Sequence, residues 1–238
     1  MSDTHWSERT ELLLGAEKCE RLRHARVLIV GLGGVGAYAA EMLVRAGVGH
    51  FMLLDADEVQ PSNINRQLCA LHSTIGQNKV DILAVRFRDI NPDVDIIPRA
   101  EFLDENMVGH LLDETHFDFI VDAIDTIAPK CALIMEAMKR KIKIVCSMGA
   151  GAKTDITQIR FADLWETYHC GLSKAVRTRL KKAGMHHPLP VVFCSQQADV
   201  NAVIKVEGER NKKTTTGTVS YMPAVFGCYL AQYVINRL

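Results

Sequence analysis

Residues 27–36 read VLIVGLGGVG, an unbroken apolar run that ends in a glycine-rich turn. So short an apolar run is typical of a strand that is buried on both faces of a parallel sheet. Gly31, Gly33 and Gly36 have the G-x-G-x-x-G spacing of a turn that lets phosphate groups approach the backbone at a helix N-terminus. With Gly34 among them, we expect this turn to contact a nucleotide; the alternative is a tight turn that binds nothing.

Further apolar runs follow, and each is separated from the next by a stretch of helical character. Strands are expected at 50–57, 95–100, 117–125 and 142–151, and helices at 36–47, 74–90, 104–114 and 129–141. Such alternation builds a doubly wound sheet, because right-handed crossovers place helices on both faces. The sequence therefore predicts an α/β, Rossmann-like fold with a mainly parallel sheet and a C-terminal extension of added strands and helices.

The chain divides into three predicted segments. Residues 1–25 form an N-terminal helical arm, 26–155 a nucleotide-binding core, and 156–238 the C-terminal extension. The extension is expected to hold a basic helix at 172–184, a strand at 186–195, a mobile loop at 207–218, a strand-like stretch at 218–223 and a closing helix that begins near residue 223.

Composition excludes several classes of protein. The 238 residues carry 28 basic and 28 acidic side chains, so a strongly basic coat for nucleic acid is absent. The seven cysteines form no C-x-x-C pair, which argues against a structural zinc site. The N-terminus has no apolar signal core, and the most apolar stretch, 221–235, is shorter than the roughly 20 residues of a membrane span. We expect a cytoplasmic protein, with peripheral membrane contact left open.

Asp55 stands where a ribose-binding acid is expected. It ends the second predicted strand, about 20 residues after Gly36, and a carboxylate there accepts hydrogen bonds from ribose hydroxyls. The alternative is a surface acid at a strand end. At this point an NAD-dependent oxidoreductase explains the glycines and Asp55 as well as an ATP-binding protein does.

The polar residues beyond that strand favour ATP. Asn63, Arg66 and Gln67 follow in one run, and Lys79 comes twelve residues later, in the opening part of the next predicted helix. An Arg and a Lys near a glycine turn neutralise the charge of a triphosphate, whereas the pyrophosphate of NAD gains less from them. We therefore expect Arg66 and Lys79 to face the phosphates.

Asp122 and Asp125 end the fourth predicted strand. A carboxylate at the carboxyl edge of a parallel sheet can bind Mg²⁺ through its oxygens. Asp125 is the expected Mg²⁺ ligand, and its alternative role is to cap the helix that follows.

These residues together carry a family resemblance. The motifs GLGGVG, LLDADEVQPSNINRQL, GQNKVD, INP and DAID resemble the ubiquitin-activating-enzyme-like adenylating family, which includes the bacterial partners of ThiS and MoaD. This similarity spans roughly residues 9–165. The segments SERTELLLG, GAGAKTDITQIRFADL and GTVSYMPAVFG are most similar to the branch that dehydrates threonylcarbamoyladenosine in tRNA, and that likeness extends over most of the chain.

The resemblance implies a role for each candidate residue and makes 26–155 an adenylation core. The glycines border the nucleotide, Asp55 holds the ATP ribose, Asn63, Arg66 and Lys79 contact the phosphates, Asp125 binds Mg²⁺, and Arg9 reaches a site across a dimer interface. Asp57, Gln67 and Asp122 complete the predicted nucleotide-binding set. Arg66, Lys79 and Asp125 are the predicted catalytic set, with Cys194 as a further candidate.

Two departures from the family pattern bear on the chemistry. Sulfur-carrier activators commonly have two C-x-x-C pairs for zinc, which this chain lacks, so no zinc is expected and that branch is disfavoured. Many relatives have a late cysteine, but here Val192 occupies the usual position and Cys194 lies just beyond it. A nucleophilic cysteine needs a pKa depressed by nearby positive charge. The alternative for Cys194 is a buried thiol.

The implied function is ATP-dependent cyclisation of threonylcarbamoyladenosine beside the tRNA anticodon. Adenylation of the threonyl carboxylate would let the ureido group close a ring and release AMP. The implied ligands and partners are ATP, Mg²⁺, the modified tRNA and a second copy of the chain; a monovalent cation and a sulfur-transfer protein are left open, and DNA is not expected. The alternatives are an adenylyltransferase acting on the C-terminal glycine of a ubiquitin-like sulfur carrier, an NAD-dependent oxidoreductase and a non-enzymatic scaffold.

The basic helix at 172–184 has two interpretations. Lys174, Arg177 and Lys181 recur at three- and four-residue spacing and form one charged stripe. Such a stripe could bind an RNA backbone, or it could be a solvated helix face.

Overall fold

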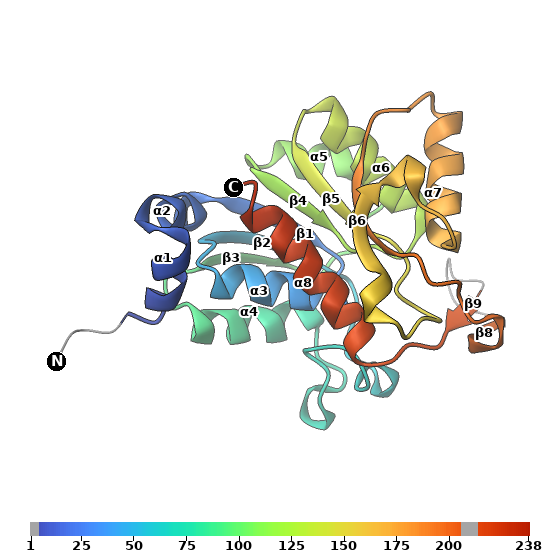
Figure 1. Ribbon diagram of the computed structural model, residues 1–238. Helices are drawn as coiled ribbons and strands as arrows, with labels where there is room; N and C mark the ends of the chain where they lie inside the picture. The colour runs from blue at the N-terminus through green and yellow to red at the C-terminus, as the bar shows by residue number, and fades with distance from the viewer. Residues whose placement is uncertain (1–4, 206–213) are drawn as a thin grey trace.

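The computed structural model describes residues 5–205 and 214–238, which contain one seven-stranded sheet (Figure 1). The strands are β1 Arg26–Val30, β2 His50–Leu54, β3 Asp95–Arg99, β4 Phe119–Asp122, β5 Lys143–Ser147, β6 Ile159–Asp163 and β7 Pro190–Cys194. Their order across the sheet is β3-β2-β1-β4-β5-β7-β6, and β6 runs antiparallel to β7 while the other neighbours are parallel. The predicted α/β fold with a mainly parallel sheet is confirmed.

Helices cover both faces of the sheet (Figure 1). They are α1 Glu8–Leu14, α2 Ala16–His24, α3 Gly36–Arg45, α4 Lys79–Ile90, α5 Val108–Asp113, α6 Ile127–Lys139, α7 Gly171–Lys182 and α8 Tyr221–Ile235. Helices α3, α4 and α8 pack with alternate residues of β1 such as Ile29, and α5, α6 and α7 share the other core with Leu28. Both faces of β1 are therefore buried, which explains why this strand has no polar residue after Arg26. In the described ranges no helix combines the length and apolar character that crossing a membrane requires.

Three local expectations meet a different structure. The N-terminal helical stretch is two helices, because Gly15 between them has φ +81°, a left-handed conformation. The strand-like prediction for 218–223 is wrong: α8 begins at Tyr221, and Pro223 is tolerated in its first turn, where helical N–H groups have no partner in any case. The predicted mobile loop falls partly on residues 206–213, outside the described residues, while Thr214–Thr216 forms β9, antiparallel to β8 Val203–Lys205.

Helix α8 lies directly against α3. A Cβ added at Gly227 in α8 would come within 2.6 Å of Val35 O and 2.7 Å of Tyr38 Cβ. At the start of α8, Pro223 takes the space next to Gly34, whose added Cβ would lie 3.0 Å from Pro223 Cβ. The closing helix thus braces the helix that starts at the glycine turn.

A buried charge ties α3 to α4. Glu41 in α3 is 5% exposed and accepts hydrogen bonds from Arg86 Nε at 2.6 Å and from Arg45 Nε at 3.0 Å. Burial raises the pKa of the Glu41 carboxyl, but the hydrogen bonds from Arg86 and Arg45 outweigh it, so this pKa lies below its ordinary value.

Candidate active site

The glycine turn sits at the carboxyl ends of β1, β2 and β4, and it leaves no room for a side chain at Gly31 or Gly36. Gly31 has φ +87°, its N–H donates to Leu54 O at 2.9 Å, and an added Cβ would lie 2.9 Å from Ala123 O. A Cβ added at Gly36 would lie 1.8 Å from Gly31 O. The turn therefore closes tightly onto the start of α3, which leaves the backbone open to a ligand.

Asp55 lies just beyond β2 and is bonded to the glycine turn. Its carboxylate accepts from the Leu32 N–H at 2.6 Å and from the Asp57 N–H at 2.8 Å. Burial raises the pKa of the Asp55 carboxyl, and the charge of Lys79 and these two N–H groups partly offset the rise. An ionised carboxylate has about four acceptor positions, so lone pairs remain for ribose hydroxyls.

Lys79 is held at the same edge. It is the first residue of α4, only 2% exposed, and its Nζ lies 2.7 Å from Asp57 Oδ2. The backbone N–H of Lys79 also donates to Asp57 O at 3.1 Å. The Asp57 side chain is 72% exposed and that of Lys79 only 3%, so the Lys79 cation lies beneath this carboxylate at the nucleotide edge.

The polar run after β2 forms a tight turn against the glycines. Asn63 is buried and its Oδ1 accepts from the Gln60 N–H at 3.0 Å, which fixes a short 3₁₀ turn. A Cβ added at Gly33 would lie 3.7 Å from Gln67 Nε2, and a Cβ added at Gly34 would lie 3.2 Å from Arg66 O. The structure thus places this run beside the glycine turn.

The Arg66 guanidinium closes its own turn. Its Nη1 donates to Ser62 O at 2.8 Å and to Asn65 Oδ1 at 2.9 Å. A guanidinium has five N–H donors, so Arg66 can hold this turn and still bind a phosphate oxygen.

The two carboxylates after β4 have different surroundings. Asp122 and Lys130 are both fully buried, with Lys130 Nζ 2.9 Å from Asp122 Oδ2. Asp122 Oδ1 accepts from the Ile124 N–H, and Lys130 Nζ donates to Ile124 O, both at 3.0 Å. Asp125 is exposed, one residue before Thr126, the N-cap of α6. Asp122 therefore shapes the turn from within, while Asp125 is the accessible carboxylate.

Cys194 lies away from solvent at the end of β7. It is fully buried, and its Sγ points to Asp155 O at 3.7 Å. Its carbonyl oxygen accepts from the buried Lys153 Nζ at 2.5 Å. This burial favours the alternative interpretation of Cys194 as a structural thiol.

Arg9 is not gathered with the other candidates. Arg9 lies on α1, which is followed directly by α2. Arg21 of α2 donates from Nε to Leu238 O at 3.2 Å, so α2 lies near the C-terminal end of α8. Pro223, against Gly34, is at the opposite end of α8, a 15-residue helix that spans about 22 Å at 1.5 Å per residue. Within one chain α1 therefore lies far from the glycine turn, as Figure 1 shows.

A model of the ThiF family matches residues 8–238. The chain belongs to the ThiF family. This ThiF-family chain is 38% identical over 241 residues to the tRNA threonylcarbamoyladenosine dehydratase of Bacillus subtilis (strain 168), covering 98% of this chain and 94% of that protein. The structure of E. coli tRNA N6-threonylcarbamoyladenosine dehydratase, TcdA, in complex with AMP matches with a TM-score of 0.87 and 30% identity, covering 96% of this chain and 92% of that one.

The ATP complex of the same E. coli enzyme matches with a TM-score of 0.87 and 30% identity, over 96% of this chain and 91% of that one. The resemblance to the adenylating family and to its dehydratase branch is thereby confirmed.

Lys130 is the site residue that sequence reasoning missed. The signal was present: Lys130 stands directly before CALIM, in an otherwise apolar stretch of α6. A lysine on a buried helix face requires a buried partner, and Asp122 at the end of a neighbouring strand was the available carboxylate.

Proposed function

We propose that this ThiF-family protein is an ATP-dependent enzyme that dehydrates threonylcarbamoyladenosine next to the tRNA anticodon. The single observation that carries the proposal is the arrangement of Asp55, Lys79 and Arg66 around a glycine turn in a chain similar to named dehydratases along its length. The turn offers backbone to the phosphates, Asp55 offers oxygens to the ribose, and two cations lie beside them.

The chemistry begins with a poor electrophile. A carboxylate does not react with weak nucleophiles because its leaving group would be oxide. Attack of one threonyl carboxylate oxygen on the α-phosphorus of ATP forms an acyl–adenylate and expels pyrophosphate. Lys79 and Arg66 would stabilise the charge that develops on the phosphate oxygens, and the glycine turn would hold the triphosphate in line with the carboxylate.

Ring closure then needs no nucleophile from the protein. The ureido group of the substrate attacks the activated carbonyl, the bond from that carbonyl to AMP breaks, and the ureido group loses a proton. The net change is loss of one water from the nucleoside with conversion of ATP to AMP and pyrophosphate. Full burial of the Cys194 thiol agrees with a route that does not use a protein thioester.

Mg²⁺ belongs to the proposal through Asp125. Its exposed carboxylate follows β4, the strand next to β1, and carboxylate oxygens are ligands that Mg²⁺ prefers. Over residues 5–205 and 214–238 no three Asp, Glu, His or Cys side chains gather as a metal site, so phosphates and water would supply the other ligands. Bound there, the ion would neutralise phosphate charge.

A homodimer is the second part of the proposal. Leu12 and Leu13 on α1 are 81% and 83% exposed, and Trp6, just before α1, is 43% exposed. A second copy could cover these apolar side chains. Arg9 lies on the same helix and would reach the partner's nucleotide site. We also propose a cytoplasmic location because the substrate would be tRNA; a monovalent cation and a sulfur-transfer partner stay predictions from the resemblance.

The decisive assay incubates the protein with ATP, Mg²⁺ and tRNA that carries threonylcarbamoyladenosine, and then measures nucleoside mass after digestion. We expect the mass to fall by one water with the wild type and not with Lys79→Ala. An unchanged nucleoside with the wild type rejects the function. ATP–pyrophosphate exchange that depends on a carrier protein ending in glycine, and not on tRNA, would support the sulfur-carrier alternative instead.

A further inference from the structure

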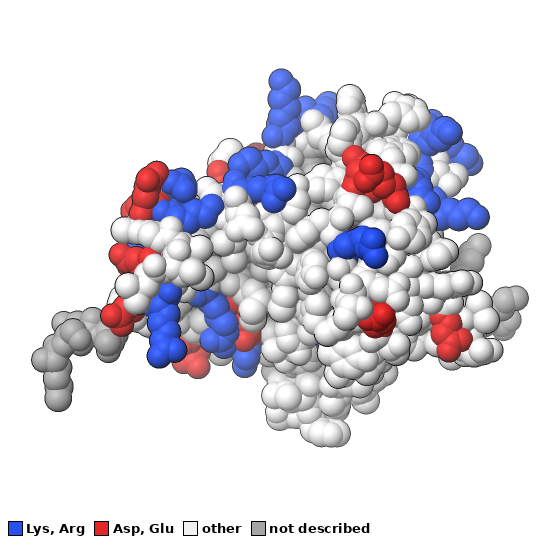
Figure 2. All heavy atoms as spheres, in the orientation of Figure 1, with Lys and Arg blue, Asp and Glu red and all other residues white. Residues whose placement is uncertain are grey.

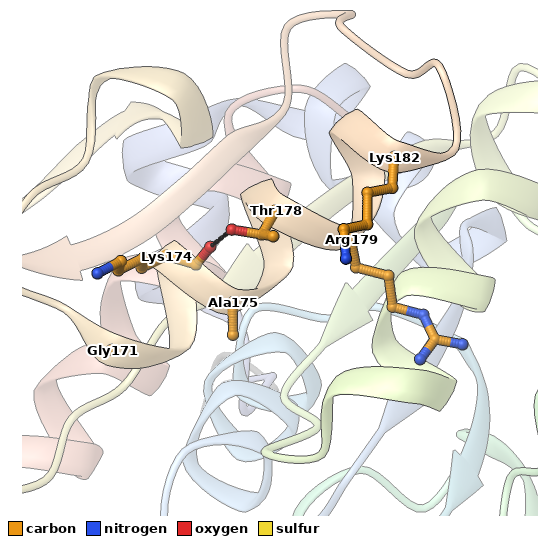
Figure 3. Close-up of a pocket in the computed structure, with 6 residues that line it drawn as sticks. All are labelled: Gly171, Lys174, Ala175, Thr178, Arg179 and Lys182. Atoms are coloured by element: carbon orange, nitrogen blue, oxygen red, sulfur yellow. Dashed lines mark hydrogen bonds between the residues drawn. The ribbon is translucent and has the colours of Figure 1, made fainter.

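The outer face of α7 is a hollowed basic surface outside the nucleotide edge. A hollow of about 650 Å³ is lined by Gly171, Lys174, Ala175, Thr178, Arg179 and Lys182, which share one face of the helix (Figure 3). We call these six residues the α7 hollow. Figure 2 shows Lys and Arg side chains along the margin of the molecule over α7.

The cations that point outward from α7 differ from those that the sequence predicts. Arg177, predicted in the exposed stripe, turns toward the core, where its Nη1 donates to Leu164 O at 3.1 Å and to Thr167 O at 2.8 Å. Val176 and Leu180 are buried on that side. Arg177 therefore fixes the helix to the domain, and the outward cations of the hollow are Lys174, Arg179 and Lys182.

These three cations are spread along the helix and do not converge on one point. Figure 3 shows Lys174 toward one end of α7 and Arg179 with Lys182 toward the other, and α7 rises about 12 Å between Lys174 and Lys182 at 1.5 Å per residue. A single small anion would need converging donors. An extended polyanion, with one negative charge at each repeat of its backbone, matches the spread.

The small residues of the hollow allow a backbone to come close. Gly171 and Ala175 leave the helix surface low, and the Thr178 hydroxyl donates to Lys174 O at 2.8 Å, which turns its methyl group and oxygen along the helix. Arg179 is oriented by Glu105, whose Oε2 lies 2.6 Å from Arg179 Nη2. Arg179 is thus positioned by an ion pair, and all three cations project from one helix.

The N-terminal end of α7 packs against a loop at the carboxyl edge of the sheet. The start of α7 packs on the loop after β5, since a Cβ added at Gly149 would lie 3.5 Å from Cys170 Sγ and 3.8 Å from Leu172 Cβ. Strand β5 pairs with β4, and Cys146 of β5 is the partner of Asp122 of β4. Asp125 follows Asp122 by three residues, so the end of β5 lies beside this part of the nucleotide edge. A strand of nucleic acid that leaves the site over β4 and β5 would reach α7 next.

We propose that the α7 hollow binds the ribose–phosphate backbone of the tRNA next to the reacting nucleoside. The inference rests on the proposed function, because it takes its ligand from that reaction. It assigns backbone binding to Lys174, Arg179 and Lys182 and no sequence-specific contact to α7.

The test measures the affinity of the full-length protein for tRNA carrying threonylcarbamoyladenosine over a range of salt concentrations. Lys174→Gln combined with Lys182→Gln removes two phosphate contacts, so the slope of log K against log salt should become shallower by roughly 1.4–1.8, at 0.7–0.9 per contact. KM for tRNA should rise while ATP affinity and kcat at saturating tRNA stay unchanged. Ala175→Phe, which fills the hollow without changing charge, should weaken tRNA binding with no change of slope.

Lys139→Gln is the matched control. Lys139 ends α6, its side chain is 75% exposed, and it does not line the hollow. If the double variant has the same salt slope and the same KM for tRNA as Lys139→Gln, the inference is wrong. Weakened binding to an acidic carrier protein with unchanged binding to tRNA also overturns it. A wild type that binds tRNA with the expected slope yet leaves the nucleoside mass unchanged refutes the proposed function instead.

Discussion

Lys130→Met tests how the turn before Asp125 is held in place. Lys130 and Asp122 are both fully buried, and Lys130 Nζ contacts Asp122 Oδ2 at 2.9 Å and Ile124 O at 3.0 Å. Met has a similar length and no charge, so the substitution keeps most of the packing and leaves the Asp122 carboxylate without its counter-charge. Removal of one partner of a buried pair costs about 3–5 kcal/mol.

That free energy is large enough to measure by heating. In a chain of this size 1 kcal/mol shifts Tm by about 2–4 °C, so the free energy above predicts a fall of roughly 6–20 °C. The matched control is Lys139→Met on the same helix, where the side chain is 75% exposed and the expected change is within about 0.5 kcal/mol.

The double variant Lys130→Met with Asp122→Asn should recover most of the loss. It removes both charges and keeps an oxygen that can accept from the Ile124 N–H, which Asp122 Oδ1 does at 3.0 Å. The reasoning is refuted if Lys130→Met unfolds at the same temperature as Lys139→Met, or if the double variant is less stable than the single one.

Lys79→Ala should weaken ATP binding roughly 10- to 150-fold, the equivalent of about 1.5–3 kcal/mol for a lost charged hydrogen bond, and isothermal titration would contradict this by giving a wild-type Kd. Gly36→Ala should lower the urea midpoint by the equivalent of about 1–3 kcal/mol or more, since its Cβ would meet Gly31 O at 1.8 Å. The control Gly109→Ala, whose added Cβ has its nearest contact at 3.6 Å, should leave the midpoint unchanged. Equal midpoints for the two variants would disprove this prediction. Glu41→Gln should be less stable than the wild type at neutral pH, because the folded state lowers the pKa of the Glu41 carboxyl. The difference in unfolding free energy should be complete above the unfolded pKa of about 4.3 and should shrink as the pH falls below it. A difference in unfolding free energy that stays constant from pH 6 to pH 3 would count against that pair of arginine bonds.

Features set by neighbours in the sequence could be predicted. The apolar run before Gly31 specifies a buried parallel strand, and the glycine spacing specifies the turn that follows it. Asp55 and Lys79 could be placed at one edge because parallel strands end on the same side of a sheet. These predictions depend on period, length and the direction of the chain, all of which are visible in one sequence.

Features set by distant partners could not be predicted. The inward turn of Arg177 depends on the carbonyl groups of Leu164 and Thr167, and a charged helix residue does not reveal whether such acceptors lie beneath it. The burial of Cys194 likewise depends on the strands and loops around β7. A residue's type and spacing indicate its chemistry, but its environment follows from contacts that are remote in sequence.

The packing of α8 on α3 has a consequence for the order in which parts of the fold can form during synthesis. Gly34 in the phosphate turn rests against Pro223, and Gly227 lets α8 approach the backbone at Val35. These supports lie far downstream of the turn that they brace, since Pro223 comes 189 residues after Gly34 (223 − 34). A nascent chain can therefore pair its early strands before α8 exists, but its glycine turn is braced only after α8 has been made and has packed against α3.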